Sequence, residues 1–67
     1  MRWYDVGTRV IYQSQKRDNK RYDGQEAEVM GHDPNRRDSL GDKIHWIRFK
    51  DGHDLFVSPS ELTPVNP

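Results

Sequence analysis

Basic side chains in two polar stretches are the residues of this 67-residue chain whose type and spacing best suit ligand chemistry. The first stretch spans residues 15–22 and ends in Tyr22, and the second spans residues 35–43. Together they carry Lys16, Arg17, Lys20, Arg21, Arg36, Arg37 and Lys43. Clustered cations bind phosphates, and an adjacent aromatic ring can stack on a base. We therefore predict a polyanion-binding surface, with nucleic acid as the first candidate partner. The alternative is a pair of solvated loops whose charge nearby aspartates partly neutralise.

The overall charge balance brings in a second kind of partner. The chain holds 11 basic and 11 acidic residues, so its formal net charge at pH 7 is zero. Residues 1–22 and 36–50 are mainly basic, whereas residues 23–35 and 51–67 are mainly acidic. A neutral chain can therefore still present a basic surface at one end. Non-specific nucleic-acid binders usually carry excess positive charge, however, so neutrality favours the hypothesis that the partner is another protein.

That second hypothesis centres on Trp46. Side chains alternate along a strand, so Ile47 and Phe49 face one side while Ile44, Trp46 and Arg48 face the other. If Ile47 and Phe49 are buried, Trp46 is left exposed beside Arg48, a composition typical of interface anchors. We predict that Ile44, Trp46 and Arg48 form the interface of an inhibitor or accessory subunit, which could also bind through an open sheet edge. The alternative is that the N-terminal Trp-Tyr segment or the second basic stretch covers Trp46.

The chain shows no pattern typical of catalysis, metal binding or cofactor binding. His32, His45 and His53 have no recognised ligand spacing, and there is no cysteine for a thiolate site, so we expect solvated histidines. Glu26 and Glu28 alternate with apolar residues, as on the solvated face of a strand. No nucleophile–base pair, Gly-rich phosphate loop or cofactor motif is present. We expect a non-enzymatic binding protein without a metal or cofactor.

Membrane and secretion signals are also missing from the sequence. No apolar run approaches the ~20 residues of a membrane-spanning helix. The first five residues lack the apolar segment of a secretion signal. We expect a soluble intracellular protein, cytoplasmic or, in a eukaryote, nuclear, with no membrane partner. The chain begins with Met and ends soon after its last predicted strand, which suits a free-standing protein and a domain of a longer one equally.

The hairpin over residues 44–57 is the element that must organise the fold. Its Asp51-Gly52 pair predicts a tight primed turn, which needs positive φ at both central positions. After the turn, Leu55 and Val57 share the core side and Phe56 takes the opposite side. A lone hairpin is marginally stable in water, so further strands must cover it.

Further strands are predicted over residues 9–14, 25–32 and 62–65. A short helix over 25–30 is the alternative, because good helix formers occupy it. Residues 15–23, with a loose hairpin at Asp18-Asn19, and residues 33–43 are predicted loops. Ser58, Pro59 and Glu61 match a capped 3₁₀ turn ahead of the last edge strand. The result is one all-β domain over residues 1–67 with a small core of Val10, Tyr12, Ala27, Val29, Ile47, Phe49, Leu55, Val57, Leu62 and Val65.

Four segments carry a resemblance to a known fold group: residues 6–10, 22–29, 47–52 and 57 with 61–64. Their Gly-x-x-Val, Ala-x-Val, Phe-x-Asp-Gly and Leu-x-Pro patterns resemble those of SH3-like barrels, within them the Tudor and KOW-type modules, over roughly residues 6–65. The resemblance implies a small five-stranded barrel with one 3₁₀ turn before the last strand. It also implies a third function, peptide reading through an aromatic cage. Ser14 and Gln25 occupy two positions where cage aromatics usually lie, and Phe49 occupies a third.

Overall fold

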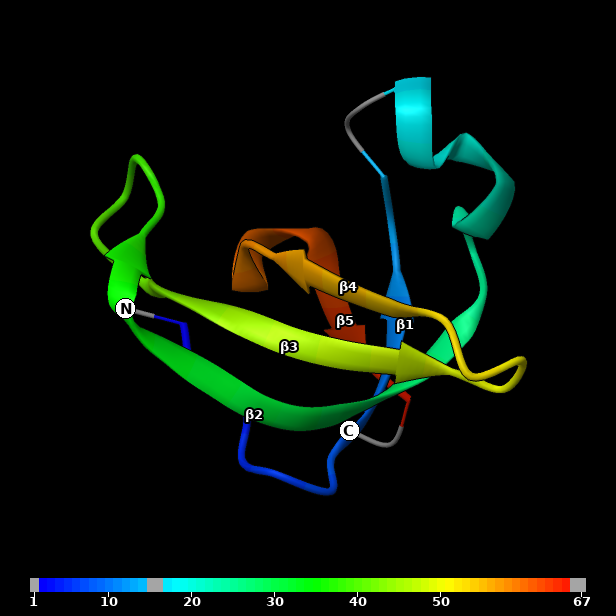
Figure 1. Ribbon diagram of the computed structural model, residues 1–67, viewed down its shortest axis with the longest axis horizontal. Coiled ribbons are helices and arrows are strands. Elements are labelled where there is room, and N and C mark those ends of the chain that lie inside the picture. Colours follow the sequence, from blue (N-terminus) through cyan, green and yellow to red (C-terminus); the bar gives the residue numbers. More distant parts are fainter. Residues whose placement is uncertain (1, 15–16, 66–67) are drawn as a thin grey trace.

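The computed structural model describes residues 2–14 and 17–65, with the side chains of residues 17–19 outside the description. Its strands are β1 (Arg9–Tyr12), β2 (Glu26–Arg37), β3 (Lys43–Phe49), β4 (Asp54–Val57) and β5 (Leu62–Pro64). Two 3₁₀ helices, η1 (Arg17–Tyr22) and η2 (Pro59–Glu61), lie between them. The strands form one antiparallel sheet in the order β4-β3-β2-β1-β5, in which β2 and β3 are the long central ribbons of Figure 1. The predicted all-β class with five strands is confirmed.

Strand β2 is longer than the sequence predicts. It continues through Asp33 to Arg37, because Asp33 pairs with Ile44 and Arg37 pairs with Lys43 of β3. Pro34 lies in the register irregularity between those two pairs, where a strand can do without a backbone N–H donor. The prediction of a loop over residues 33–43 is therefore wrong. Only the short turn between β2 and β3 lies outside the strands.

The other predicted loop is also partly wrong. Residues 17–22 form η1 rather than a loose hairpin at Asp18-Asn19. The helix ends at Tyr22, whose ring packs against Phe49 of β3. Burial of that ring draws this polar stretch back onto the sheet.

The central hairpin forms where predicted, but its turn differs. The N–H of Gly52 donates to the carbonyl of Phe49 at 3.0 Å, and only Gly52 in this turn has positive φ, at 89°. Lys50 and Asp51 at the centre therefore keep ordinary negative φ. The Phe49 N–H donates to the carbonyl of His53 at 2.9 Å, which makes Gly52 the left-handed residue of a G1 bulge. The predicted primed turn is wrong, because Asp51 does not take the positive φ that such a turn needs and Gly52 follows a different turn as its bulge residue.

The link into the last strand follows the sequence pattern. Ser58 caps η2, and the Glu61 carboxylate accepts a hydrogen bond from the Ser58 backbone N–H, which completes a capping box with Pro59 at the first position. The predicted strand at residues 25–32 and the edge strand β5 are confirmed as well, and β5 pairs with β1. The helix alternative for residues 25–30 is wrong.

The buried core largely matches the predicted set. Its members are Val10, Tyr12, Tyr22, Ala27, Val29, Ile47, Phe49, Val57 and Leu62, with Leu55 partly buried against them. Val65 is only half-buried. Two buried rings were not expected there, those of Tyr22 and His45.

Candidate functional site

An exposed aromatic pair lies on the outer face of β3 and β4. Trp46 and Phe56 are direct cross-strand partners, and their rings stack with centroids 6.2 Å apart. Trp46 is half-buried, whereas Phe56 is 53% exposed. Strand alternation accounts for this placement, because Ile47 and Val57 beside them face the core. When a partner covers an apolar ring this exposed, the ring leaves water, and this lowers the free energy of the complex.

A guanidinium group lies over each ring of the pair. The Arg36 guanidinium carbon is 5.1 Å from the Phe56 ring centroid, and that of Arg48 is 5.6 Å from the Trp46 centroid. Both distances are within the range of cation–π attraction. We call Arg36, Trp46, Arg48 and Phe56 together the aromatic–arginine face.

Each of these arginines also has a carboxylate partner. Arg36 Nε lies 2.7 Å from Asp33, and Arg48 Nε lies 2.7 Å from Asp54. The hydrogen bond from Arg36 lowers the pKa of Asp33, and that from Arg48 lowers the pKa of Asp54. Both carboxylates are therefore charged at neutral pH. The face consequently offers guanidinium N–H donors with little net charge.

Gly31 explains how the indole of Trp46 lies against β2. The two residues are paired across β2 and β3 next to a register shift, and a Cβ on Gly31 would lie only 3.1 Å from Trp46 Cε3. Any larger residue would push the indole away. The indole N–H is buried and makes no hydrogen bond within the described residues, although Trp46 is close enough to Asp54 to help lower that pKa.

The structure brings together the predicted interface residues Ile44, Trp46 and Arg48 on one side of β3. The Trp3 ring of the N-terminal segment contacts His32 and His45 on the opposite side of the sheet, and Arg36 of the second basic stretch lies over Phe56, the neighbour of Trp46. Phe56 and Arg36 were missed as members of this site. Alternation along residues 54–57 already placed Phe56 opposite Val57, so the signal for Phe56 was present. The position of Arg36 depends on the length of β2, which the sequence did not reveal.

The two basic stretches do not form one surface. Arg37 pairs with Lys43 at the start of β3, whereas Tyr22 packs on Phe49 at its end. The seven residues of β3 separate these points by roughly 20 Å of extended chain. Figure 1 accordingly shows η1 (cyan) and the turn after β2 (green) at opposite ends of the molecule.

Several of the predicted cations are engaged within the chain. Arg37 Nη1 donates to the Gly41 carbonyl at 2.9 Å, and Lys43 Nζ lies 5.9 Å from the Trp3 ring centroid. Lys20 and Arg21 are exposed on η1. Lys16 and the side chain of Arg17 lie outside the described residues.

Tyr22 cannot serve as the predicted base-stacking ring. It is only 6% exposed, and it stacks on Phe49 at 4.4 Å and on His53 at 4.8 Å. Its hydroxyl donates to Asp51 at 3.0 Å, and burial together with this bond raises the pKa of Tyr22. The ring is part of the core.

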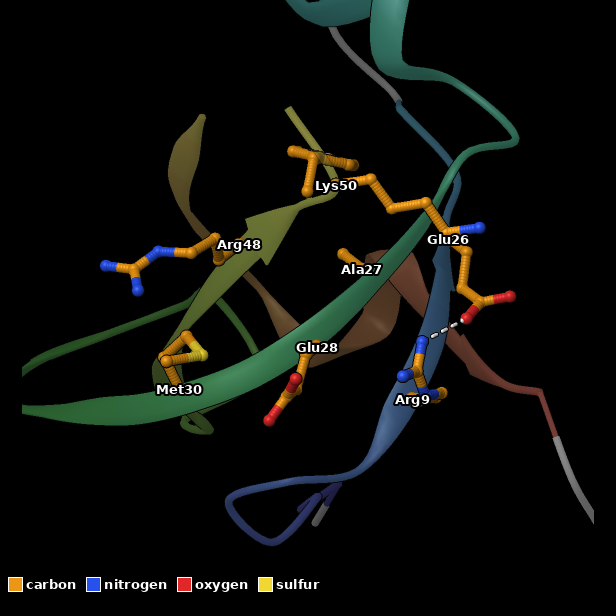
Figure 2. Close-up of a pocket in the computed structure, with 8 residues that line it drawn as sticks. Arg9, Glu26, Ala27, Glu28, Met30, Arg48 and Lys50 are labelled. Atoms are coloured by element: carbon orange, nitrogen blue, oxygen red, sulfur yellow. Dashed lines mark hydrogen bonds and ion pairs between the residues drawn. The ribbon is translucent and has the colours of Figure 1, made fainter. Parts of the chain in front are cut away.

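A shallow depression adjoins the aromatic–arginine face on the outer side of β1, β2 and β3. Its volume is about 270 Å³, and Arg48 belongs to both surfaces. Figure 2 shows Met30 and the charged side chains that line this depression. Arg9 and Glu26 among them form an ion pair at 2.7 Å. The charges alternate in sign across it, which suits a polar rim better than a catalytic cleft.

The histidines depart most clearly from expectation. All three histidines were predicted to be solvated. Instead, His45 is fully buried and His32 is half-buried, and only His53 is exposed. His32 and His45 lie 4.5 Å apart at right angles, beneath the N-terminal segment. His45 lies two residues before buried Ile47 in β3, so its side chain faces the same core side of the sheet. His32 pairs with His45 across β2 and β3 and therefore faces that side too.

Comparison with known proteins returns no assignment: no family model, no curated protein and no solved structure matches the chain. Among the described residues there is no cluster of three or more side chains suited to hold a metal ion. No helix in residues 2–14 or 17–65 is long and apolar enough to cross a membrane.

Proposed function

We propose that this chain is a non-enzymatic interaction module that binds another protein through the aromatic–arginine face. The observation that carries the proposal is the exposed Phe56 ring, stacked on Trp46 and flanked by Arg36 and Arg48. Tyr, Trp, Phe and Arg are the residues enriched at interface centres, and a few such residues supply most of the binding energy.

The paired charges favour a protein over a polyanion. A phosphate backbone would compete with Asp33 for Arg36 and with Asp54 for Arg48, each held at 2.7 Å. A protein segment needs no such exchange. Its apolar side chain would cover the rings, and its backbone carbonyls would accept from guanidinium N–H groups that the carboxylates leave free. The partner we propose is therefore a protein surface that presents an apolar side chain flanked by carbonyl oxygens.

Single-stranded nucleic acid is the second candidate, and it would use the same rings. Bases stack on exposed aromatic side chains, and arginines add cation–π attraction. The stacked Trp46–Phe56 pair supports this candidate at a different place from the predicted basic stretches. Binding to phosphates weakens steeply with salt, whereas apolar contact does not, so salt dependence separates the two candidates.

We also propose that the sheet curls into an SH3-like barrel. Support comes from the strand order, which puts β1 between β2 and β5, and from η2 directly before β5. The Tudor-type cage reader has less support than the other functions. Phe49, the one matching cage position, is buried against Tyr22 and Tyr12.

Site-specific photo-crosslinking tests the proposed face. A benzophenone amino acid replaces Phe56 in one variant and Leu40 in the control, because Leu40 is also apolar and exposed, at 71%, but lies in the turn after β2. Both proteins are irradiated in an extract of the cells in which this protein is naturally made. We expect a protein adduct from position 56, unchanged at 0.5 M salt, and none from position 40. Equal labelling at both positions would contradict the proposal, and a nucleic-acid adduct lost at high salt would support the second candidate instead.

A further inference from the structure

The N-terminal segment is attached to the sheet mainly through ionisable side chains. Residues 2–5, which we call the strap, lie outside every strand. The Arg2 N–H donates to Asp42 at 3.1 Å, the Tyr4 N–H donates to His45 Nε2 at 3.1 Å, and the Tyr4 carbonyl accepts from His32 Nε2 at 2.7 Å. The Tyr4 hydroxyl adds one bond of a different kind, to the Leu62 carbonyl at 3.2 Å. The backbone of the strap therefore depends on groups that change charge with pH.

The partners of His45 define its tautomer. Nδ1 lies 2.9 Å from the carbonyl oxygen of Lys43, and a carbonyl can only accept, so Nδ1 carries the hydrogen. Nε2 must then accept from the Tyr4 N–H, which can only donate. A proton added to His45 would enter at Nε2 and place two N–H donors against each other. The docked strap is thus incompatible with a charged His45.

His32 responds differently to a proton. Its Nε2–H already donates to the Tyr4 carbonyl, so an added proton would enter at Nδ1 and leave that bond intact. The Trp3 ring stacks on His32 at 3.7 Å, and a charged imidazole on an indole is attracted to it. His32 can therefore hold the strap in both charge states, which leaves His45 as the sensitive group.

The surroundings of His45 decide how readily it takes a proton. Burial is the main cause that lowers the pKa of His45, and His32 acts in the same direction. Asp38 and Asp42 of the turn after β2 act against it, as does the Lys43 carbonyl. The Lys43 ammonium lies over Trp3, and the carboxylate of Glu61 is bound in the η2 capping box.

From this geometry we infer that the strap is a pH-sensitive latch: neutral His45 holds Tyr4 on the sheet, and protonation of His45 releases residues 2–5 while the strands stay paired. Release would uncover the His45 end of the core, which Tyr4 and Trp3 cover at neutral pH. The latch lies on the core side of β2 and β3, so it does not depend on the proposed binding function of the outer face.

NMR on the unmodified protein tests the latch directly. The ¹⁵N shifts of His45 and the Tyr4 amide resonance are followed from pH 7.5 to pH 4.5, with the amides of Val29 and Ile47 as reporters of the sheet. We expect the Nδ1–H tautomer at pH 7.5, then a shift of the Tyr4 amide with the same midpoint as His45, below pH 6.5, while the sheet amides stay in place. A Tyr4 amide that is unmoved as His45 titrates, or strap release only together with the sheet, would overturn the inference.

Three variants assign the effect to His45. In His45→Gln the neutral amide can still accept from Tyr4 but takes no proton, so the Tyr4 amide should show no transition. His32→Gln should keep the transition. His53→Gln, which changes an exposed histidine far from the strap, is the matched control and should behave as the unmodified protein. A transition retained in His45→Gln would contradict the latch, and if that variant does not fold, the co-titration in the unmodified protein decides.

Discussion

Two aromatic clusters of this molecule are almost equally exposed but differ in how they are held. Trp3 of the strap is 47% exposed and Phe56 of the aromatic–arginine face is 53% exposed. The Trp3 indole N–H donates to Asp5 at 2.9 Å, its ring stacks on His32, and backbone hydrogen bonds hold Tyr4 next to it. The Trp46 indole N–H makes no hydrogen bond of standard geometry within the described residues, although Asp54 lies near it, and stacking and cation–π contacts hold the rings there.

The difference shows that exposure alone does not identify a binding surface. The Trp3 ring is held by the hydrogen bond of its own indole N–H and by the backbone hydrogen bonds of Tyr4 beside it, so it contributes to the fold. A ring with only apolar and cation–π contacts can be covered without loss. The strap cluster is therefore held by hydrogen bonds within the chain, whereas the aromatic–arginine face is the surface that we propose for binding.

The largest effect is expected at His45 in the strap cluster. His45→Ala removes a fully buried ring, its hydrogen bond to the Lys43 carbonyl and the acceptor of the Tyr4 N–H. We expect a loss of about 2–4 kcal/mol in the free energy of unfolding, measured by urea denaturation, from the cavity and the unpaired groups. His53→Ala on the exposed histidine is the control and should cost much less. Equal losses for the two variants would show that the buried cluster does not stabilise the fold.

A smaller loss is expected beneath the aromatic–arginine face. Gly31→Ala places a Cβ 3.1 Å from the Trp46 ring, so we expect about 1–2 kcal/mol of destabilisation from overpacking. Urea denaturation of Gly31→Ala in a Trp46→Ala background is the check. The cost should largely disappear there, because the two effects share one contact. An unchanged cost would mean that strain in the backbone, rather than the indole, is responsible.

The pH dependence of stability separates the two clusters again. The pKa of His45 is lowered from 6.5 on folding, so below pH 6.5 the unfolded chain binds more protons than the folded chain. Stability is therefore full above pH 6.5 and is lost as the pH falls from there through the lowered pKa of His45. Urea denaturation at a series of pH values should show this slope in the unmodified protein and not in His45→Gln. A slope that persists in the variant would assign the effect to another group.

Protonation of three aspartates should cause a second loss of stability, at lower pH. The pKa values of Asp33, Asp38 and Asp54 are lowered from 3.8 by hydrogen bonds from Arg36, Ser58 and Arg48 respectively. Their contribution is present above pH 3.8 and is lost as the pH falls through their lowered values. Urea denaturation of Arg48→Gln should show a smaller loss than the unmodified protein below pH 3.8. An equal loss would mean that the ion pair contributes nothing in solution, as is common for exposed pairs.

Local pattern accounts for much of the fold and part of the site. Alternation predicted that Ile47 and Val57 are buried and that Trp46 faces outward, and Ser58 with Glu61 marked the capped 3₁₀ turn. The same alternation placed His45 with Ile47, yet its residue type suggested solvation. Its burial depends on a hydrogen-bond acceptor and donor supplied by Lys43 and by Tyr4, which lies 41 residues away in the chain.

What the sequence did not show depends on contacts between distant segments. Pro34 and Asn35 are typical of loops, but β3 pairs with the chain on both sides of them. The length of β2 then carries Arg36 to Phe56 and separates the two basic stretches. Tyr22 lies in a polar segment, and only its stacking on Phe49 shows that it is buried.

The proposed face is tested most directly by the affinity of the crosslinked partner for three forms of the chain: unmodified, Phe56→Ser and Leu40→Ser. Phe56 and Leu40 are both exposed and neither belongs to the buried core, so both variants should unfold within about 1 kcal/mol of the unmodified protein. We predict that Phe56→Ser weakens binding by at least about tenfold, as expected for a residue at an interface centre, and that Leu40→Ser changes it little. Equal affinity of all three forms would contradict the assignment of the aromatic–arginine face as the binding surface.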